Sequence, residues 1–338
     1  MDVTPAETDS MGVTDLLSAY GADAITPKEV VQRVYYRLGK ADTNAWIATR
    51  DEAAVLDDAA ALSSASTDDK PLYGVPFAVK DNIDHRELPT SAGCPAYTYR
   101  PETTATSVEQ LIEAGALLIG KTNMDQFATG LVGTRSPYGV CRNVYNRVYI
   151  SGGSSSGSAI AVARGHVPVA LGTDTAGSGR IPAALNGLVG LKPTRGVISN
   201  DGVVPGCASL SCVSVLAETV DDAVRVERVA AGYDPDDPYS RLSAGVFDDS
   251  DINPESICVG IPAADQLEFF GDSESEQLFE DAIAGIEGLF GSVERIDFAT
   301  FEEASDLLYN GPWVAERLTT VGDFIKDHPD DIDLTVRG

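Results

Sequence analysis

Two clusters of hydroxyl side chains, each set among glycines, lie close together in this sequence. "SGGSSSGSAI" covers residues 151–160 and "GTDTAGSGR" covers residues 172–180, whereas the whole chain has only 3 histidines. A serine nucleophile in these clusters therefore needs a base other than histidine. A lysine that has lost its solvent can act as that base, with a second serine carrying the proton between the amine and the nucleophile.

Three strand-like runs end in a lysine: "FAVK" at Lys80, "LLIGK" at Lys121 and "GLVGLK" at Lys192. The ends of buried strands are where the sites of α/β proteins assemble, because loops converge there on a rigid sheet. Burial lowers the pKa of a lysine and can leave a neutral amine near neutral pH. For any one of these lysines taken alone, an amine reaching water at the sheet edge is the simpler interpretation. Together with the two clusters, Lys80 is predicted to complete one site.

The first cluster has three alternative interpretations. The pattern Gly153-x-Ser155-x-Gly157 could be a nucleophile elbow, but an elbow needs a downstream acid followed by a histidine. His166 follows too closely, and only His328 remains, in the acidic stretch "KDHPDD". A phosphate-binding loop is the second interpretation, but no Lys-Ser or Lys-Thr pair follows. The third is a tight turn before the helix "SAIAVA".

The second cluster favours catalysis over a simple turn. Residues 173–179 combine small and hydroxyl side chains, and they lead through Arg180 into a helix that is expected to begin near Pro182. Such a turn can aim successive backbone N–H groups at one point, which is the geometry that stabilises a developing oxyanion.

The surrounding sequence predicts the elements that position these residues. Thr26, Pro27 and Glu29 are typical of the start of a helix that ends at Gly39, with a capping box and a first-turn proline. "NAWIAT" predicts a strand and "DEAAVLDDAAAL" a helix. From Tyr73 onward, short apolar runs alternate with helical patterns, which indicates an α/β layer structure with a largely buried sheet.

Residues 233–256 are rich in Asp, Pro and Ser and predict a long surface connection. It could mark a domain boundary. We favour an excursion within one domain, because the strand-like "ICVGI" beyond it can still join the same kind of sheet.

The charge balance limits the partners of the chain. Its 338 residues are 43% hydrophobic, and 24 Lys and Arg stand against 52 Asp and Glu, giving a net charge of −28. Such a chain repels nucleic acids and anionic membranes. The acidic residues are spread along the chain, which favours a salt-rich cytoplasm that screens their repulsion, although an ordinary acidic protein is the alternative.

The cysteines and the apolar segments indicate the cellular compartment in which the chain functions. The 5 cysteines are an odd set without a CxxC pair, so neither a disulfide framework nor a zinc site is predicted, and we expect them to be reduced and mostly in the core. No signal peptide or membrane-spanning segment is predicted. We therefore expect a soluble, cytoplasmic protein.

Three segments closely resemble the amidase signature family: "GVPFAVKDNID", "GGSSSGSAIAVA" and "GTDTAGSGRIPAALNGLVGLKPT". The resemblance implies the amidase signature fold, an α/β fold with a large mixed β-sheet core flanked by helices on both faces. It also implies amide hydrolysis by a triad: Ser178 as the nucleophile, Ser154 as the bridging serine in a cis peptide, and Lys80 as the base. The backbone N–H groups of residues 175–177 (Thr175, Ala176 and Gly177) would form the oxyanion hole.

Within this family, segments such as "TNMDQFATGLVGTRSPYG" and "LLYNGPWVAER" are most similar to those of allophanate hydrolases. This implies that Tyr309 and Arg317 hold the carboxylate of the substrate, a pairing suited to a planar anion; without the resemblance, packing along a helix would explain both. Ala208 and Ser211 depart from the arginine and aspartate usual at these positions. Family domains also usually continue further, so we expect residues 1–338 to form a single amidase domain that is incomplete at its C-terminal end.

The resemblance implies hydrolysis of allophanate, a carboxylated urea, to ammonia and carbon dioxide through an acyl-enzyme. No metal or organic cofactor is expected. The implied metabolic partner is a biotin-dependent urea carboxylase on a separate chain, and a homodimer is a further expectation. The alternatives are the glutamine-hydrolysing subunit of a tRNA amidotransferase, a general amidase, or a non-catalytic fragment or interaction subunit.

Overall fold

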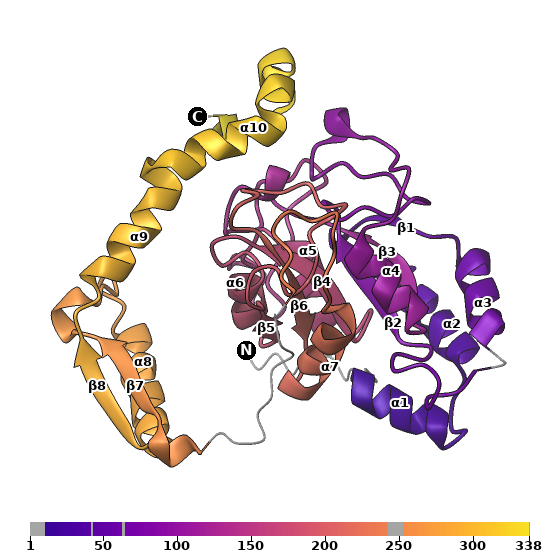
Figure 1. The fold of residues 1–338 in the computed structure, drawn as a ribbon, viewed down its shortest axis with the longest axis horizontal. Coiled ribbons are helices and arrows are strands. Elements are labelled where there is room, and N and C mark those ends of the chain that lie inside the picture. The colour runs from indigo at the N-terminus through magenta and orange to yellow at the C-terminus, as the bar shows by residue number, and fades with distance from the viewer. Residues whose placement is uncertain (1–10, 42, 63–64, 243–252, 338) are drawn as a thin grey trace. The chain divides into compact units, whose positions relative to one another are not determined.

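The computed structural model describes residues 11–41, 43–62, 65–242 and 253–337. The chain forms two compact units, Met1–Ala244 with Glu316–Gly338 and Gly245–Ala315. Figure 1 shows a larger sheet in the first unit and a pair of strands in the second. The prediction of a single domain over residues 1–338 stays a prediction.

The first unit is built on a mixed six-stranded sheet with the strand order β1-β3-β2-β4-β6-β5. Neighbouring strands β2, β3 and β4 are parallel, whereas β1 runs antiparallel to β3, and β6 runs antiparallel to both β4 and β5. The strands are β1 (Trp46–Thr49), β2 (Pro76–Lys80), β3 (Leu117–Thr122), β4 (Val169–Asp174), β5 (Val189–Leu191) and β6 (Cys212–Ala217). Strands β2, β3, β4 and β6 are buried along their whole length, as the continuous apolar runs predict.

Helices cover both faces of this sheet, which confirms the fold expectation. Alternate residues of β2 separate the two cores: Phe77 packs with α4 and α7, and Ala78 packs with α2, α3 and α5. The α-helices between residues 11 and 242 of this unit are α1 (Val13–Gly21), α2 (Pro27–Leu38), α3 (Glu52–Ala61), α4 (Thr106–Glu113), α5 (Ser156–Ala163), α6 (Arg180–Leu185) and α7 (Val220–Ala230).

Local sequence signals explain where these helices begin. The side chain of Thr26 accepts a hydrogen bond from the backbone of Glu29, whose carboxylate accepts one from the backbone of Thr26, so the predicted capping box of α2 is confirmed. The helix after the second cluster begins at Arg180, slightly before the predicted start near Pro182. Its first backbone N–H groups bond the Asp174 carboxylate, which sequence reasoning did not include.

The C-terminal segment of the first unit packs onto a separate apolar cluster. Val321 of α10 (Pro312–Asp327) and Ile332 lie buried with Ala92, Cys94 and Phe127. The amide of Gln126 donates to the carbonyl of Asp331 at 2.8 Å. The short helix α11 (Leu334–Arg337) ends this segment.

The second unit holds a βαβ arrangement. Strands β7 (Cys258–Pro262) and β8 (Ser292–Ile296) pair in parallel, with α8 (Ser273–Glu287) between them in the chain and α9 (Ala299–Asn310) after them. The strand predicted at "ICVGI" forms as β7, but it is not part of the six-stranded sheet, because it pairs with β8 in a two-stranded sheet of its own. Strand β8 follows β7 after a single long helix, and consecutive strands joined by one helix commonly pair in parallel.

All 5 cysteines are free thiols, and all but Cys258 are buried, as expected. Within the described ranges, no helix is long and apolar enough to cross a membrane.

Candidate active site

Lys80 is the last residue of β2, at the centre of the larger sheet, and its side chain is fully buried. Its Nζ lies 2.7 Å from Oγ of Ser154 and 2.7 Å from Oγ1 of Thr173. Burial lowers the pKa of Lys80 to about 7, although the charges of Asp125 and Asp174 act in the opposite direction. A large fraction of this amine is therefore neutral near pH 7, and it contacts a serine hydroxyl.

Ser154 lies in the turn that leads into α5, and its side chain is also fully buried. The Gly153–Ser154 peptide bond is cis, as the family resemblance implied. The glycine before it is required by space: a Cβ on Gly153 would lie 2.1 Å from an oxygen of Asp125 and 2.6 Å from the backbone nitrogen of Gly133. Gly153 thus lets the backbone approach the buried carboxylate of Asp125 closely.

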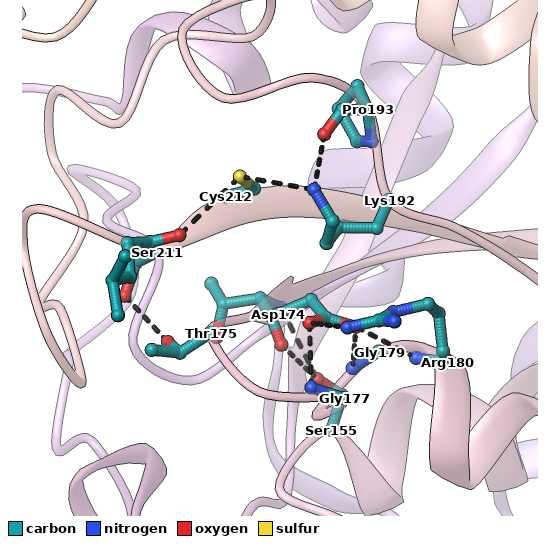
Figure 2. Close-up of polar contacts among 12 residues, drawn as sticks. Ser155, Asp174, Thr175, Gly177, Gly179, Arg180, Lys192, Pro193, Ser211 and Cys212 are labelled. Atoms are coloured by element: carbon teal, nitrogen blue, oxygen red, sulfur yellow. Dashed lines mark hydrogen bonds and ion pairs between the residues drawn. The ribbon is translucent and has the colours of Figure 1, made fainter. Parts of the chain in front are cut away.

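The second cluster is a turn wrapped around the carboxylate of Asp174, the last residue of β4. This carboxylate accepts hydrogen bonds from the backbone N–H groups of Gly177, Gly179 and Arg180 at 2.8, 3.1 and 3.1 Å, and the guanidinium of Arg180 adds two more at 3.0 Å (Figure 2). Burial opposes ionisation, but the bonds from Arg180 and Gly177 hold the pKa of Asp174 below its usual value. The turn is therefore fixed by a permanent negative charge at its centre.

Ser178 lies in this turn and is almost fully buried. Its backbone carbonyl accepts a hydrogen bond from the backbone N–H of Ser155 at 3.1 Å, and Oγ of Ser155 donates to the carbonyl of Thr173 at 3.1 Å. These two bonds hold the turn of Ser178 against the segment that carries Ser154. The structure thus brings the backbones of the two glycine-rich clusters together beside Lys80.

The backbone N–H groups of the turn differ in their availability. Gly177 was predicted as an oxyanion donor, but its N–H already donates to Asp174. The N–H groups of Thr175, Ala176 and Ser178 make no hydrogen bond to any described residue. Two of the three predicted donors are therefore unoccupied, and Ser178 adds a third that sequence reasoning did not include.

A neighbouring loop contacts the same turn. Oγ of Ser211 lies 2.7 Å from Oγ1 of Thr175 (Figure 2), and it also accepts a bond from the backbone of Cys207 at 3.3 Å. The Glu316 carboxylate binds the backbone and the hydroxyl of Ser209 in this loop at 2.6 and 2.5 Å. Ser211, which departs from the residue usual in allophanate hydrolases, is therefore in direct contact with the predicted oxyanion hole.

Tyr309 and Arg317, predicted to bind the carboxylate of the substrate, lie on different helices. Tyr309 belongs to α9 in the unit Gly245–Ala315, and Arg317 belongs to α10 in the unit that includes Glu316–Gly338. Their joint role stays a prediction.

Two residues that the sequence analysis did not single out contribute to the geometry. Thr173 contacts the amine of Lys80, and Asp174 organises the turn. Both end the strand before the second cluster, and a polar pair closing a buried apolar run is the signal that could have identified them. Among the described residues, no cluster of His, Cys, Asp or Glu could hold a metal ion.

Comparison with known proteins places these residues in a family context. The sequence model of the amidase family matches residues 29–336. The urea amidolyase of Saccharomyces cerevisiae is 47% identical over 297 residues, which cover 87% of this chain and 16% of the relative. A subunit of the glutamyl-tRNA(Gln) amidotransferase of Methanococcoides burtonii is 38% identical over 301 residues, which cover 85% of this chain and 60% of the relative.

The solved structure of Kluyveromyces lactis allophanate hydrolase superimposes with a TM-score of 0.87 at 44% identity, covering 96% of this chain and 54% of that chain. This chain therefore spans about half of that structure and less than a fifth of the yeast urea amidolyase.

Proposed function

The chain belongs to the amidase family, and we propose that it hydrolyses allophanate to ammonia and carbon dioxide with Lys80, Ser154 and Ser178. The contact at 2.7 Å between the hydroxyl of Ser154 and the buried amine of Lys80, whose pKa burial lowers to about 7, carries the chemical part of this proposal. The 44% identity to K. lactis allophanate hydrolase over 96% of this chain supports the choice of substrate.

The first half of the reaction moves a proton from each of two serines and forms one carbon–oxygen bond. The amine of Lys80 takes the proton of Ser154, Ser154 takes the proton of Ser178, and Oγ of Ser178 attacks the amide carbonyl. The resulting oxyanion is bound by the free N–H groups of Thr175 and Ala176, each contributing about 3–4 kcal/mol to lowering the barrier. For Gly177 to contribute as well, its N–H would have to leave the Asp174 carboxylate.

The second half regenerates the enzyme. The protonated amine returns its proton through Ser154 to the leaving nitrogen, so ammonia departs and an acyl-enzyme on Ser178 remains. Water then loses a proton along the same path and attacks the acyl carbonyl, which releases the acid. The released acid, a nitrogen that carries two carboxyl groups, loses carbon dioxide to give carbamate, and carbamate then breaks down to ammonia and a second carbon dioxide. Tyr309 and Arg317 would hold the carboxylate of the substrate throughout.

Ammonia release from allophanate by the purified chain tests this proposal. Ser178→Ala should abolish release, and Ser154→Ala should lower it strongly. Ser66→Ala, at an exposed serine whose hydroxyl donates to the carboxylate of Asp69, is the matched control and should retain full activity. Equal ammonia release by the Ser178→Ala variant and the wild-type chain would contradict the assignment of the nucleophile.

A second candidate function is the glutaminase activity of a tRNA amidotransferase, which the 38% identity to the M. burtonii subunit favours. A general amidase is a broader version of the same chemistry. Glutamine and simple amides in the same ammonia assay distinguish these possibilities from allophanate. A chain that releases ammonia from none of these substrates would instead be a non-catalytic fragment or interaction subunit.

The supply of the substrate and the setting of the enzyme are part of the proposal. Allophanate is urea carrying one carboxyl group, so a urea carboxylase must precede this enzyme, and we propose a functional link to a biotin-dependent one. We also propose a salt-rich cytoplasm, because a net charge of −28 is self-repulsive at low ionic strength. A melting temperature that rises steadily with KCl concentration would support it, and a constant one would contradict it. The homodimer stays a prediction.

A further inference from the structure

Outside the candidate active site, an open hollow in the first unit is lined by an unusual number of cations. Its volume is about 540 Å³. The wall is formed by the end of α2, the residues that follow it, the 140–147 segment and the residues after α5. The five cationic residues of this wall, called here the basic hollow, are Arg37, Lys40, Arg142, Arg147 and Arg164.

This gathering is notable because the chain as a whole is strongly acidic. Only 24 residues are Lys or Arg against 52 Asp and Glu, yet five of the 24 line this one hollow. None of its described lining residues is acidic. Like charges held together repel one another, and a bound anion would relieve that repulsion.

Arg37 and Arg164 each donate to a backbone carbonyl of the wall. Arg37 donates to the backbone carbonyl of Gly165 at 2.7 Å, and Arg164, the C-cap of α5, donates to the carbonyl of Val144 at 3.4 Å. Cations at helix ends with free carbonyls are stabilising, so these two positions have a reason to be basic without any ligand. That reason does not extend to Lys40 and Arg142.

Lys40 and Arg142 are exposed and leave donors available. Lys40 donates to the hydroxyl of Tyr36 and lies 4.0 Å from the centre of that ring, which leaves further N–H groups of its ammonium. The guanidinium of Arg142 makes no hydrogen bond or ion pair with any described residue. A guanidinium whose N–H groups are available can donate two parallel hydrogen bonds to two oxygens of a phosphate.

Neutral polar groups in the same wall complement the cations. The indole N–H of Trp46 donates to Nδ1 of His166 at 3.1 Å, so the proton of the neutral imidazole is on Nε2, a donor. Burial and the charges of Arg37 and Arg164 lower the pKa of His166 to about 4, which keeps the ring neutral at pH 7. His166 therefore adds no further repulsion to the hollow.

We propose that the basic hollow binds an anion carrying phosphate groups, either inorganic or attached to a nucleoside. Several cations around one concave surface match an anion with several charged oxygens better than a monovalent halide. The volume of about 540 Å³ is within the range of small-molecule sites and admits both sources. This inference is independent of the amidase reaction.

Isothermal titration of the full chain with inorganic phosphate, pyrophosphate and ATP tests the proposal, with KCl holding the ionic strength constant. At least one of these anions should bind saturably, and Arg142→Glu should weaken its binding about tenfold or more. Arg225→Glu, at an exposed arginine of α7, makes the same charge change elsewhere and should leave affinity unchanged within about twofold. Lys40→Glu is the second variant if Arg142→Glu does not unfold cooperatively.

The outcomes separate the sources of the anion and can overturn the site. Binding of phosphate or pyrophosphate without ATP supports an inorganic ligand, and binding of ATP alone supports a nucleoside phosphate. Absence of saturable binding for all three anions would overturn the proposal, as would equal weakening by Arg142→Glu and Arg225→Glu, because that would mean a general effect of net charge.

Discussion

Lys80 and Lys121 are two buried lysines on neighbouring parallel strands, and their surroundings differ in one decisive respect. The closest contacts of the Lys80 amine are hydroxyls, those of Ser154 and Thr173 at 2.7 Å each, whereas the backbone carbonyl of Thr173 is more distant, at 3.5 Å. An amine among hydroxyls can exchange protons with them, because a hydroxyl both donates and accepts. This environment suits a base.

The amine of Lys121 is instead held by a backbone carbonyl. It donates to Ile83 at 2.5 Å and to Oγ1 of Thr90 at 2.8 Å, and the charges of Asp81 and Asp84 favour its protonated form. Burial still lowers the pKa of Lys121 to about 8. A carbonyl can only accept, so it retains the proton on the amine. The comparison shows that burial alone does not make a lysine a base. The groups that contact its amine determine whether the amine can exchange a proton.

The largest expected effect is the difference in activity between variants that lack one or the other lysine. Lys80→Met should lower ammonia release from allophanate by about 10²–10⁴-fold, because it removes the general base. Lys121→Met should change the rate only modestly once its folded fraction is taken into account. Both rates are measured with circular dichroism as the check of folding. A similar loss in both well-folded variants would break the comparison.

The pH dependence of the rate sharpens the same contrast. Because the pKa of Lys80 is about 7 and the neutral amine is the active form, kcat/KM should rise about tenfold per pH unit well below pH 7 and level off above it. Lys121→Met should retain this profile, because its amine is outside the proton path. A plateau that continues down to pH 5 would show that no group with this pKa controls the reaction.

The carboxylates that organise the turns beside each lysine allow a second comparison. Asp174 binds the turn of Ser178, whereas Asp81 accepts bonds from the backbone of Ser91 and Gly93 at 3.1 Å each. Asp174→Asn should lower kcat about 10–100-fold with little change in KM, because the oxyanion donors lose their fixed direction. Asp81→Asn should mainly lower stability, measured as the free energy of unfolding. The reverse distribution would contradict the assigned roles.

The sequence predicted local elements better than it predicted the contacts between distant residues. The capping box at Thr26 and the strand ending at Lys80 depend on neighbouring residues, so local patterns predicted them. The same local pattern, an apolar run ending in lysine, is also present at Lys121, so the pattern alone does not select Lys80. What distinguishes the two lysines are contacts with residues distant in the chain, which no local pattern contains.

The strand partners were beyond local prediction for the same reason. "ICVGI" has the composition of a buried strand, but β7 is partly exposed, and among the described strands it pairs with β8 alone. The donation of the Gly177 N–H to Asp174 likewise depends on the exact curvature of the turn. Residue types predicted that a turn with free N–H groups exists, and only the three-dimensional structure separates its occupied donors from its free ones.

The smallest expected effect concerns the contact between Ser211 and Thr175. Ser211→Ala removes one hydrogen bond at the edge of the oxyanion turn, worth about 0.5–1.5 kcal/mol, so kcat should fall only about 2–10-fold. Ser209→Ala is the matched control in the same loop, because its hydroxyl contacts Glu316 rather than the turn. If Ser211 positions the turn, its variant should lower kcat and leave KM nearly constant, whereas a change confined to KM would assign Ser211 to substrate binding instead.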